Sequence, residues 1–396
     1  MNFVLKTLKV LGIVVLSLIL MGLAYVIVST EIGNSQIKAN IDGLGTKLML
    51  VRVSSLDRTE YDFYFTYAMN DEVNVAIPLK KKSSIKLSPI FDVFKKMKTF
   101  RSKRMQFFLE PDSTIIIKGE TDDLSTTYEI VRGNELSYQE NELRKVLLPY
   151  YEEESRLYHM ADVLEDSNPE ESRRITKQFD SLRFFVVAPL RIQWAKEHPE
   201  YGLSARHFYQ ERMPEDTSIK YYHLLTDEAA KSEYGQILGK MVNGFESTKI
   251  GKIAPNFTHQ TYTGKDFSIE NLRGKYVVLD FWGTWCGPCI KEIPRMKELY
   301  NKHKDRLEIV GIAHNDTRED WEEVIKEKNL DWVHILDEKS PDSSITSLYG
   351  VLGFPTKFIL DKKGSIVGKY IGLEDEFYVQ VDSLIAAGNS ENFTQR

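Results

Sequence analysis

Cysteine is nearly missing from this sequence, which has only two cysteines among 396 residues. Glycine and proline are not in excess, and no long fibrous or low-complexity repeat occurs. With 42% hydrophobic and 28% charged residues, the chain has the composition of a globular protein. Its length exceeds what one ordinary core needs, so we expect two or three domains.

Excess positive charge is missing as well. The net charge is -6 at pH 7, and basic residues are scattered among acids except in Lys80–Lys82 and between Lys95 and Arg104. We interpret these two clusters as solvated surface. Since no glycine-rich phosphate loop or base-stacking motif is found, we expect no nucleic-acid partner.

The sequence also lacks the ligand pattern of a metal site. Zinc takes four ligands, and neither a second cysteine pair nor a spaced histidine pair is present. The isolated residues His303, His314 and His334 are interpreted as surface or core histidines. We therefore expect no metal and no cofactor.

One long hydrophobic run stands near the start of the chain. Val10 to Val28 is uncharged and would span about 28 Å as a helix, close to the thickness of a bilayer core. Lys6 and Lys9 precede the run and Glu31 follows it. The positive-inside rule then places the N-terminus in the cytoplasm.

A cleaved signal peptide is the alternative interpretation of this run. Its apolar core would be only about 7–15 residues long and would end at a small-x-small cleavage site, which Tyr25–Val28 does not supply. We favour an uncleaved signal anchor within residues 1–30. Either interpretation exports residues 31–396 across the cytoplasmic membrane, to the periplasm or another extracytoplasmic space.

Two segments of different pattern follow the run. Residues 35–133 predict a β-rich domain, with β-branched strands at 37–41, 47–53 and 114–119. Residues 134–250 predict amphipathic helices, since apolar residues recur at intervals of three and four positions. One such stripe comprises Ile175, Phe179, Leu182, Val186 and Leu190.

Residues 251–388 alternate between strand and helix patterns, which indicates a parallel sheet with covering helices. We expect strands at 276–281, 307–313, 357–360 and 366–371 and helices at 289–303, 318–328 and 374–387. The last two strands, joined at Asp361–Gly364, predict an antiparallel hairpin. Residues 389–396 predict a frayed tail.

Both cysteines lie directly after the first of these strands, in Cys286-Gly-Pro-Cys289. A dithiol exchange catalyst needs one accessible thiolate and a second sulfur close enough to resolve the mixed disulfide. At a helix N-terminus, which stabilises an anion, Cys286 is expected to point outward and Cys289 to be shielded. Pro288 suits the first helical turn. Trp282 and Trp285 are expected to shape the rim, and Trp285 is expected to contact the substrate.

These residues resemble a known family. Asp280 to Cys289, followed by Gly353-Phe354-Pro355-Thr356, resemble the thioredoxin superfamily and specifically its membrane-anchored TlpA/ResA-like branch. Gly251–Phe257 and Leu272–Lys275 are similar to that branch too. The resemblance covers residues 251–388.

A looser resemblance lies upstream. Phe107–Pro111 and residues 115–133 are similar to a β-domain of unknown function that precedes such thioredoxin domains in some exported bacterial proteins. The two resemblances and the patterns described above together predict a mixed α/β chain. Its parts are a thioredoxin-like fold at the C-terminus, a preceding β-rich domain, a helical segment and one N-terminal transmembrane helix.

The resemblance implies roles for single residues. Cys286 would be the nucleophile and Cys289 the resolving thiol. Pro355 would be a cis-proline facing the disulfide, with Phe354 and Thr356 offering backbone groups to an extended substrate. Phe354 is bulkier than the residue often found before this proline, which would narrow substrate access.

Two carboxyl groups are candidates for proton transfer. Asp280 matches the buried aspartate of thioredoxins, and Glu292 matches a glutamate beside the motif in ResA-like proteins. The competing interpretation is that Asp280 is merely buried and Glu292 is a solvated helix residue. The strand at 308–313 has no lysine of the kind that thioredoxins place near their aspartate, which predicts that Asp280 is tuned differently.

The implied function is that of a membrane-tethered, extracytoplasmic thiol:disulfide oxidoreductase. It would reduce or isomerise disulfides of exported proteins and receive electrons from a membrane electron donor. The alternative is a cell-envelope binding or assembly protein, in which residues 35–250 do the main work and the redox domain is ancillary.

Overall fold

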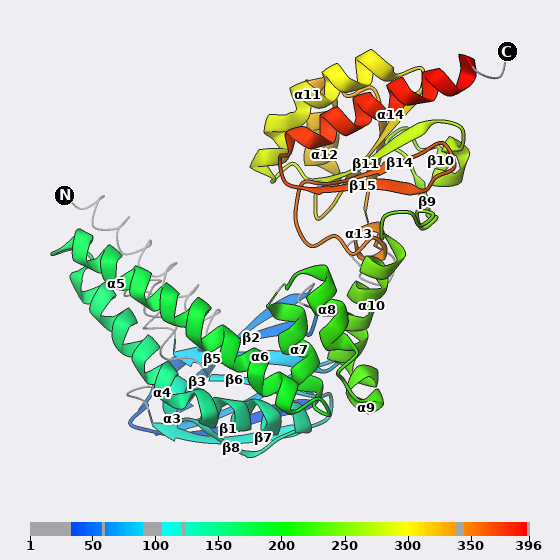
Figure 1. Cartoon of the computed structure of the whole chain (residues 1–396). Coiled ribbons are helices and arrows are strands. Elements are labelled where there is room, and N and C mark those ends of the chain that lie inside the picture. Colours follow the sequence, from blue (N-terminus) through cyan, green and yellow to red (C-terminus); the bar gives the residue numbers. More distant parts are fainter. Residues whose placement is uncertain are drawn as a thin grey trace, which may run out of the picture. The chain divides into compact units, whose positions relative to one another are not determined.

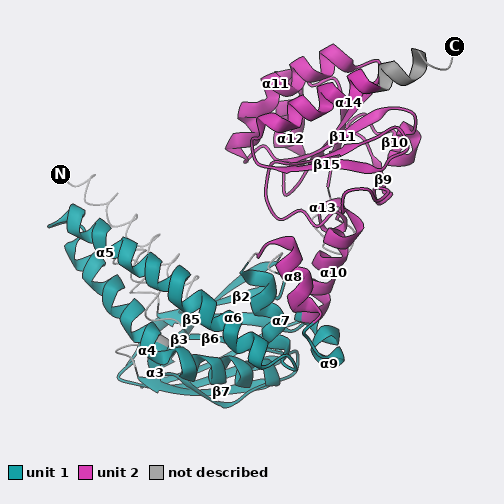
Figure 2. Ribbon diagram, viewed as in Figure 1, with its two compact units in different colours: residues 1–211, 224–234 teal, residues 212–223, 235–396 magenta. Residues whose placement is uncertain are grey.

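The computed structural model describes residues 33–57, 60–89, 105–120, 124–211, 213–337 and 344–393. The chain forms two compact units, shown in Figure 2: residues 1–211 and 224–234 make unit 1, and residues 212–223 and 235–396 make unit 2. The predicted anchor in residues 1–30 lies outside the described residues. None of the helices in the described ranges has the length and the apolar composition of a membrane-spanning helix.

Unit 1 contains an eight-stranded sheet in the order β6-β5-β2-β3-β4-β1-β7-β8 (Figure 1). Its strands are β1 (Ser35–Asp42), β2 (Lys47–Ser55), β3 (Tyr61–Met69), β4 (Glu72–Ile77), β5 (Ser83–Pro89), β6 (Met105–Leu109), β7 (Thr114–Glu120) and β8 (Glu129–Arg132). Neighbouring strands are antiparallel except β1 and β7, which are parallel. The three strands predicted in this region are confirmed as parts of β1, β2 and β7.

Period-2 alternation defines the two faces of this sheet. In β1, Ile37, Ala39 and Ile41 are buried while Gln36 and Lys38 are exposed. Inward residues of the other strands join them in one apolar core. Successive side chains of a strand point to opposite faces, so the remaining residues form a second, more polar face.

Helices follow and flank the strands of unit 1. They are α3 (Leu124–Thr127), α4 (Glu135–Leu164), α5 (Pro169–Leu182), the π-helical turn η1 (Arg183–Val187), α6 (Ala188–Glu197), α7 (Gly202–Gln210) and α9 (Asp227–Lys231). Asn134 caps α4 by accepting from the Ser137 backbone N–H, and Asn168 caps α5 in the same way. The paired helices α4 and α5 bury Leu157, Ala161, Ile175 and Phe179 between them.

The predicted apolar stripe of this region is correct at its start and wrong at Val186. Ile175 and Phe179 are buried, but Val186 is 36% exposed and Val187 is fully buried instead. The cause is the π-helical turn η1, which inserts one extra residue and so shifts the buried face by one position.

Unit 2 contains a five-stranded sheet in the order β13-β12-β11-β14-β15. The strands are β11 (Tyr276–Trp282), β12 (Leu307–Ala313), β13 (Val333–Leu336), β14 (Thr356–Leu360) and β15 (Ile366–Ile371); β9 (Thr258–Gln260) and β10 (Asp266–Ser268) form a separate pair. β11, β12 and β13 are parallel, and β14 is antiparallel to both β11 and β15. The predicted strands and the antiparallel hairpin are confirmed to within two residues.

The helices of unit 2 are α8 (Glu215–Tyr222), α10 (Glu233–Ser247), the 3-10 turn η2 (Ile269–Leu272), α11 (Gly287–His303), α12 (Arg318–Lys328), α13 (Ile345–Leu348) and α14 (Asp375–Phe393). Some of them pack on the two faces of the sheet. Val278 and Trp282 of β11 share a core with residues of α11 and α14. Val277 and Leu279 pack on the other side with Ile345 of α13. Figure 1 shows α11 and α14 together on one side of the sheet and α13 on the other.

Unit 2 differs in two ways from the segment boundaries that were predicted from the sequence. Unit 2 takes in α8 and most of α10, helices that fall within the segment 134–250. Close packing explains this for α10, because a Cβ on Gly244 would meet the Gly350 backbone N at 2.6 Å. In addition, α14 continues to Phe393, beyond residue 388 where a frayed tail is predicted.

Candidate active site

The cysteine pair lies where β11 leads into α11. Cys286 is the N-cap of α11, and it forms a disulfide with Cys289 in the first turn. The Cys289 backbone N–H donates to Cys286 Sγ over 3.3 Å. Pro288 occupies the same first turn, where a missing N–H removes no helical hydrogen bond. In the reduced form, this N–H and the helix terminus would favour a thiolate at Cys286.

Both cysteines are buried in the disulfide form. Cys286 and Cys289 are each 4% exposed, so the prediction that Cys286 points outward is wrong for this state. Its bond to Cys289 turns the sulfur into the apolar core between the sheet and α11, and Phe354 packs against the same core. Attack on a substrate therefore starts from the opened, reduced pair.

An aromatic rim borders the pair. Trp285 is 53% exposed and meets Phe354 edge-on, with 5.3 Å between ring centroids. The His314 ring stacks on the Phe354 ring, with 5.5 Å between the ring centroids and 8° between the ring planes. Trp285 Nε1 also donates to the His314 carbonyl over 2.9 Å. His314 thus belongs to the rim, a placement that the sequence did not indicate. The prediction that Trp282 shapes the rim is wrong, because Trp282 ends β11 with its ring in the core beneath α11.

Two aspartates hold the loops that carry this rim. Asp316 accepts hydrogen bonds from the backbone N–H and the hydroxyl of Thr284, just before the cysteines. Asp337 interacts with the His314 ring and accepts from Ser344 and Thr346. Burial alone would raise the pKa of Asp337, but the hydrogen bonds from His314, Thr346 and Ser344 outweigh it and lower the pKa.

The proline loop adopts the expected form. The Phe354–Pro355 peptide bond is cis. The Pro355 carbonyl accepts from the Gly372 N–H over 2.8 Å. Thr356 is buried and its hydroxyl donates to the Gly353 carbonyl over 2.8 Å, so its side chain closes the loop instead of facing a substrate.

A buried ion pair lies behind the disulfide. Lys357 Nζ on β14 is 2.6 Å from Glu292 Oε2 on α11, and their side chains are only 1% and 5% exposed. The Tyr378 hydroxyl donates to Glu292 Oε1 over 2.9 Å. The interpretation of Glu292 as a solvated helix residue is therefore wrong.

Lys357 is the functional residue that the sequence reasoning missed. It lies directly opposite Asp280 in the register of β11 and β14. The strand at 308–313 indeed has no lysine, but the strand after the proline supplies one, so Asp280 has a lysine neighbour that the sequence analysis did not consider. A single lysine in the otherwise apolar, fully buried strand Thr356–Leu360 is the signal that could have found it.

Asp280 is half-buried, with part of its surface on a small cavity of about 10 Å³. Cys289 and Glu292 line the same cavity. Burial raises the pKa of Asp280 from 3.8 to about 6; the charge of Lys357 lowers it and that of Glu292 raises it. The cavity has room for about one water molecule, enough to connect the Cys289 sulfur with a carboxyl group. A carboxyl with a pKa near 6 can take a thiol proton at neutral pH.

Comparisons with known proteins agree with this geometry. The model of the AhpC/TSA family matches residues 250–369. A thiol-disulfide oxidoreductase ResA of Bacillus cereus is 40% identical over 128 residues, which are 32% of this chain and 72% of that protein. ResA of Bacillus subtilis is 34% identical over 134 residues, which are 34% of this chain and 73% of that protein.

A solved structure is similar over the same part of the chain. It is the thioredoxin domain of a thiol-disulfide oxidoreductase from Bacteroides vulgatus, 32% identical, with a TM-score of 0.32 and coverage of 34% of this chain and 96% of that one. The assignment depends on the ResA relatives, most of whose length is matched, and on the dithiol at the start of α11. The chain therefore belongs to the thioredoxin-like AhpC/TSA family, close to the ResA-type thiol-disulfide oxidoreductases.

Proposed function

We propose that this protein is a membrane-tethered, extracytoplasmic thiol:disulfide oxidoreductase that reduces or isomerises disulfides in exported proteins. The observation that carries the proposal is the Cys286–Cys289 disulfide at a helix N-terminus, with Asp280 and Cys289 on one small cavity. A redox pair that served only for stability would need neither a titratable carboxyl behind it nor an aromatic rim in front of it.

The exchange proceeds in two steps. The Cys286 thiolate attacks a substrate disulfide, forms a mixed disulfide and releases one substrate sulfur as a thiolate. Cys289 then loses its proton to Asp280 through the small cavity and attacks Cys286 Sγ. The second substrate sulfur leaves as a thiolate, the substrate has gained two electrons, and the Cys286–Cys289 disulfide has formed.

Substrate binding is assigned to the rim and the proline loop. Trp285 and Phe354 offer an exposed aromatic edge beside the disulfide. The Phe354 backbone, just before the cis-proline, would pair with an extended substrate chain, as in strand addition to a sheet. The next two residues are already engaged, since the Pro355 carbonyl accepts from Gly372 and Thr356 lies in β14 between β11 and β15. An extended segment of an unfolded or flexible exported protein fits this arrangement better than a folded surface.

The proposed membrane anchor is inferred from the sequence, and the proposed electron donor follows from the redox cycle. The uncharged run from Val10 to Val28, preceded by Lys6 and Lys9, supports a single-pass anchor that leaves residues 31–396 outside the cytoplasmic membrane. Each reduction of a substrate leaves the dithiol oxidised. A membrane electron donor must then restore the two thiols, since the compartment outside is oxidising.

Trapping of the mixed disulfide tests the proposal. Cys289→Ser removes only the second step, so this variant should accumulate covalent adducts in cells that run larger on non-reducing gels and collapse with reductant. Cys286→Ser is the matched control and should form none. The adducts should contain exported proteins or the outer face of an electron donor.

Other results of the trapping experiment would reject parts of the proposal. Adducts that contain only cytoplasmic proteins would overturn the topology. A complete lack of adducts in several redox conditions would reject the assigned substrates and leave the cell-envelope binding protein as the better explanation.

A further inference from the structure

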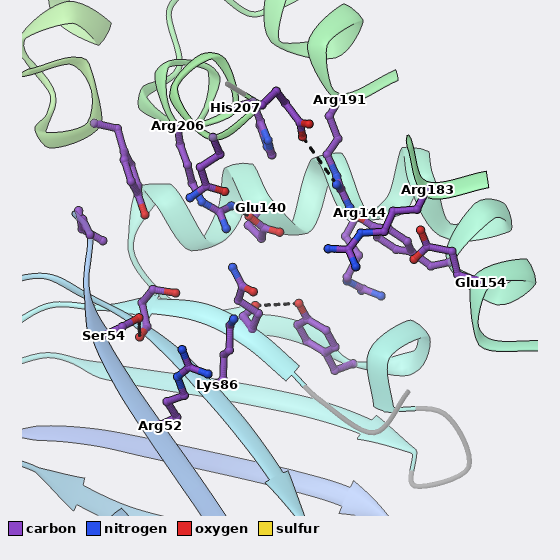
Figure 3. Close-up of a pocket in the computed structure, with 18 of the residues that line it drawn as sticks. Arg52, Ser54, Lys86, Glu140, Arg144, Glu154, Arg183, Arg191, Arg206 and His207 are labelled. Carbon is purple, nitrogen blue, oxygen red and sulfur yellow. Dashed lines mark hydrogen bonds and ion pairs between the residues drawn. The ribbon is translucent and has the colours of Figure 1, made fainter. Parts of the chain in front are cut away.

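Unit 1 contains a polar cavity of about 460 Å³ that the disulfide chemistry does not use. Figure 3 shows its position: strands form one wall, and helices form the opposite wall. Charged side chains reach into the space from both walls. The cations that line it are Arg52, Lys86, Arg144, Arg183, Arg191 and Arg206.

The sheet wall places two cations directly opposite each other. Arg52 of β2 pairs with Lys86 of β5 in the strand register, and Lys86 pairs with Gln106 of β6. Like charges opposite each other on neighbouring strands are destabilising. These residues lie on the face of the sheet that the apolar core does not occupy, so the core does not require them there.

The helix wall holds further guanidinium groups in fixed positions. Arg144 of α4 and Arg206 of α7 are each 6% exposed. Arg144 donates from Nη1 to the Thr126 carbonyl over 2.6 Å, and Arg206 Nη1 is 2.6 Å from Glu140 Oε2. The Nε atoms of Arg52, Arg144 and Arg206 are buried without a hydrogen-bond partner in the described parts of the chain.

The charges on the cavity wall are not balanced. The six cations share the cavity wall with three carboxylates, which belong to Glu140, Glu154 and Glu211. Within the described ranges, no carboxylate lies within 4.0 Å of a charged nitrogen of Arg52, Arg144 or Arg183. Positive groups gathered out of bulk water without counter-charges are costly to a fold. An anion in the cavity would offset this cost.

Neutral donors complete the lining. The side chains of Tyr61, Tyr128, Tyr151, Tyr158 and Tyr234 all line the cavity, as does His207. Burial, and then the charges of Arg206 and Arg191, hold the pKa of His207 well below its usual range. This imidazole is therefore neutral, and its Nε2 lacks a partner in the described part of the chain. It can donate to a bound oxygen without adding charge.

We propose that this cavity binds a small organic oxyanion that carries two or three negative charges in carboxylate or phosphate groups. The excess of three positive charges sets the charge of the ligand, and planar guanidinium groups match both kinds of oxyanion. The volume lies in the range of small-molecule sites. The binding site is independent of the thiol chemistry of unit 2.

Calorimetric titration of the full chain tests the binding site, with citrate as the tricarboxylate probe and pyrophosphate as the phosphate probe, at constant ionic strength. We expect one ligand to bind per chain for at least one probe. The probe that binds with the higher affinity identifies the class of oxyanion. Arg52→Gln and Arg183→Gln should each weaken binding about tenfold, the effect of losing one charged hydrogen bond. The matched control is Arg132→Gln, on the exposed end of β8 outside the cavity.

A second readout separates a binding role from a structural one. Arg52→Gln removes one of two opposed cations, so the melting temperature of the unliganded variant should stay equal or rise. Three results would overturn the proposal. They are no binding of either probe at millimolar concentration, equal weakening by Arg132→Gln, and binding that is unchanged in both cavity variants.

Discussion

Lys357 Nζ lies 2.6 Å from Glu292 Oε2, and both side chains are buried behind the redox pair. The ammonium group compensates the carboxylate next to it and also faces Asp280 across the β11–β14 pairing. Glu292 is thus fully engaged, by Lys357 and by the Tyr378 hydroxyl. Asp280 keeps one buried oxygen, Oδ1, without a partner in the described residues, and it is the carboxyl better placed to accept a proton.

Replacing Asp280 should slow the resolving step. In Asp280→Asn, the thiol of Cys289 loses its proton acceptor, and general-base catalysis is worth about a hundredfold or more. The mixed disulfide should form at the normal rate and decay slowly in single-turnover experiments with a labelled disulfide peptide. The control is Glu298→Gln, which changes an exposed carboxyl on α11, the helix that carries Cys289. If Glu292→Gln slows the decay and Asp280→Asn does not, Glu292 carries the proton.

The same substitution should change how stability depends on pH. Below about pH 3, Asp280 is protonated in the folded and the unfolded chain, so it contributes no difference. Because its folded pKa is about 6 and its ordinary value is 3.8, the free energy of unfolding falls as pH rises between these values. At about 1.4 kcal/mol per pH unit, the loss above pH 6 is about 3 kcal/mol.

Urea unfolding of the oxidised protein at pH 3 and pH 8 measures this loss. Asp280→Asn should match the parent protein at pH 3 and exceed its unfolding free energy by about 3 kcal/mol at pH 8. An equal difference between the two proteins at both pH values would show that Asp280 has an ordinary pKa in the fold.

Breaking the buried ion pair should be strongly destabilising. Lys357→Met leaves the Glu292 carboxylate buried without its cation, which costs about 3–5 kcal/mol in comparable cases. It also removes the charge that lowers the pKa of Asp280, so the pH-dependent loss of stability should extend to higher pH. The control is Lys363→Met, in the exposed turn between β14 and β15.

A double-mutant cycle isolates the pair itself. Glu292→Gln together with Lys357→Met should recover much of the stability lost in Lys357→Met, since no uncompensated charge remains. Urea unfolding of the four proteins gives the coupling energy. Strictly additive losses would mean that the 2.6 Å contact contributes nothing beyond packing.

The aromatic rim should affect protein substrates and spare small ones. Trp285→Ala removes the exposed ring beside Phe354, so we expect KM for insulin to rise about tenfold, as for an interface anchor. The rate with dithiothreitol should stay unchanged because a small dithiol needs no rim. Phe184→Ala, an exposed aromatic residue of unit 1, is the control. A matching loss with dithiothreitol would show that Trp285 shapes the disulfide instead of binding the substrate.

Local patterns in the sequence determined the redox pair and its frame. Cys286 and Cys289 follow an apolar strand and open a helix, and this pattern predicts the site because strand period, helix start and cysteine spacing are all local properties. The Gly-x-Pro turn and the hairpin of β14 and β15 were predicted for the same reason. The helix 318–328 was predicted at its observed bounds, since Trp321, Val324 and Ile325 fall on one helical face, and the structure adds Thr317 as its N-cap.

Tertiary structure alone decided the chemistry behind the pair. The register of β14 against β11 places Lys357 opposite Asp280, 77 positions earlier, and no local pattern encodes that register. Val187 replaces Val186 in the core because a π-helical turn shifts the phase, which a uniform helical period does not predict. The cations that line the cavity of unit 1 are scattered from Arg52 to Arg206 along the chain and form no cluster in the sequence. Only the packing of helices over the polar face of a sheet brings them to one cavity.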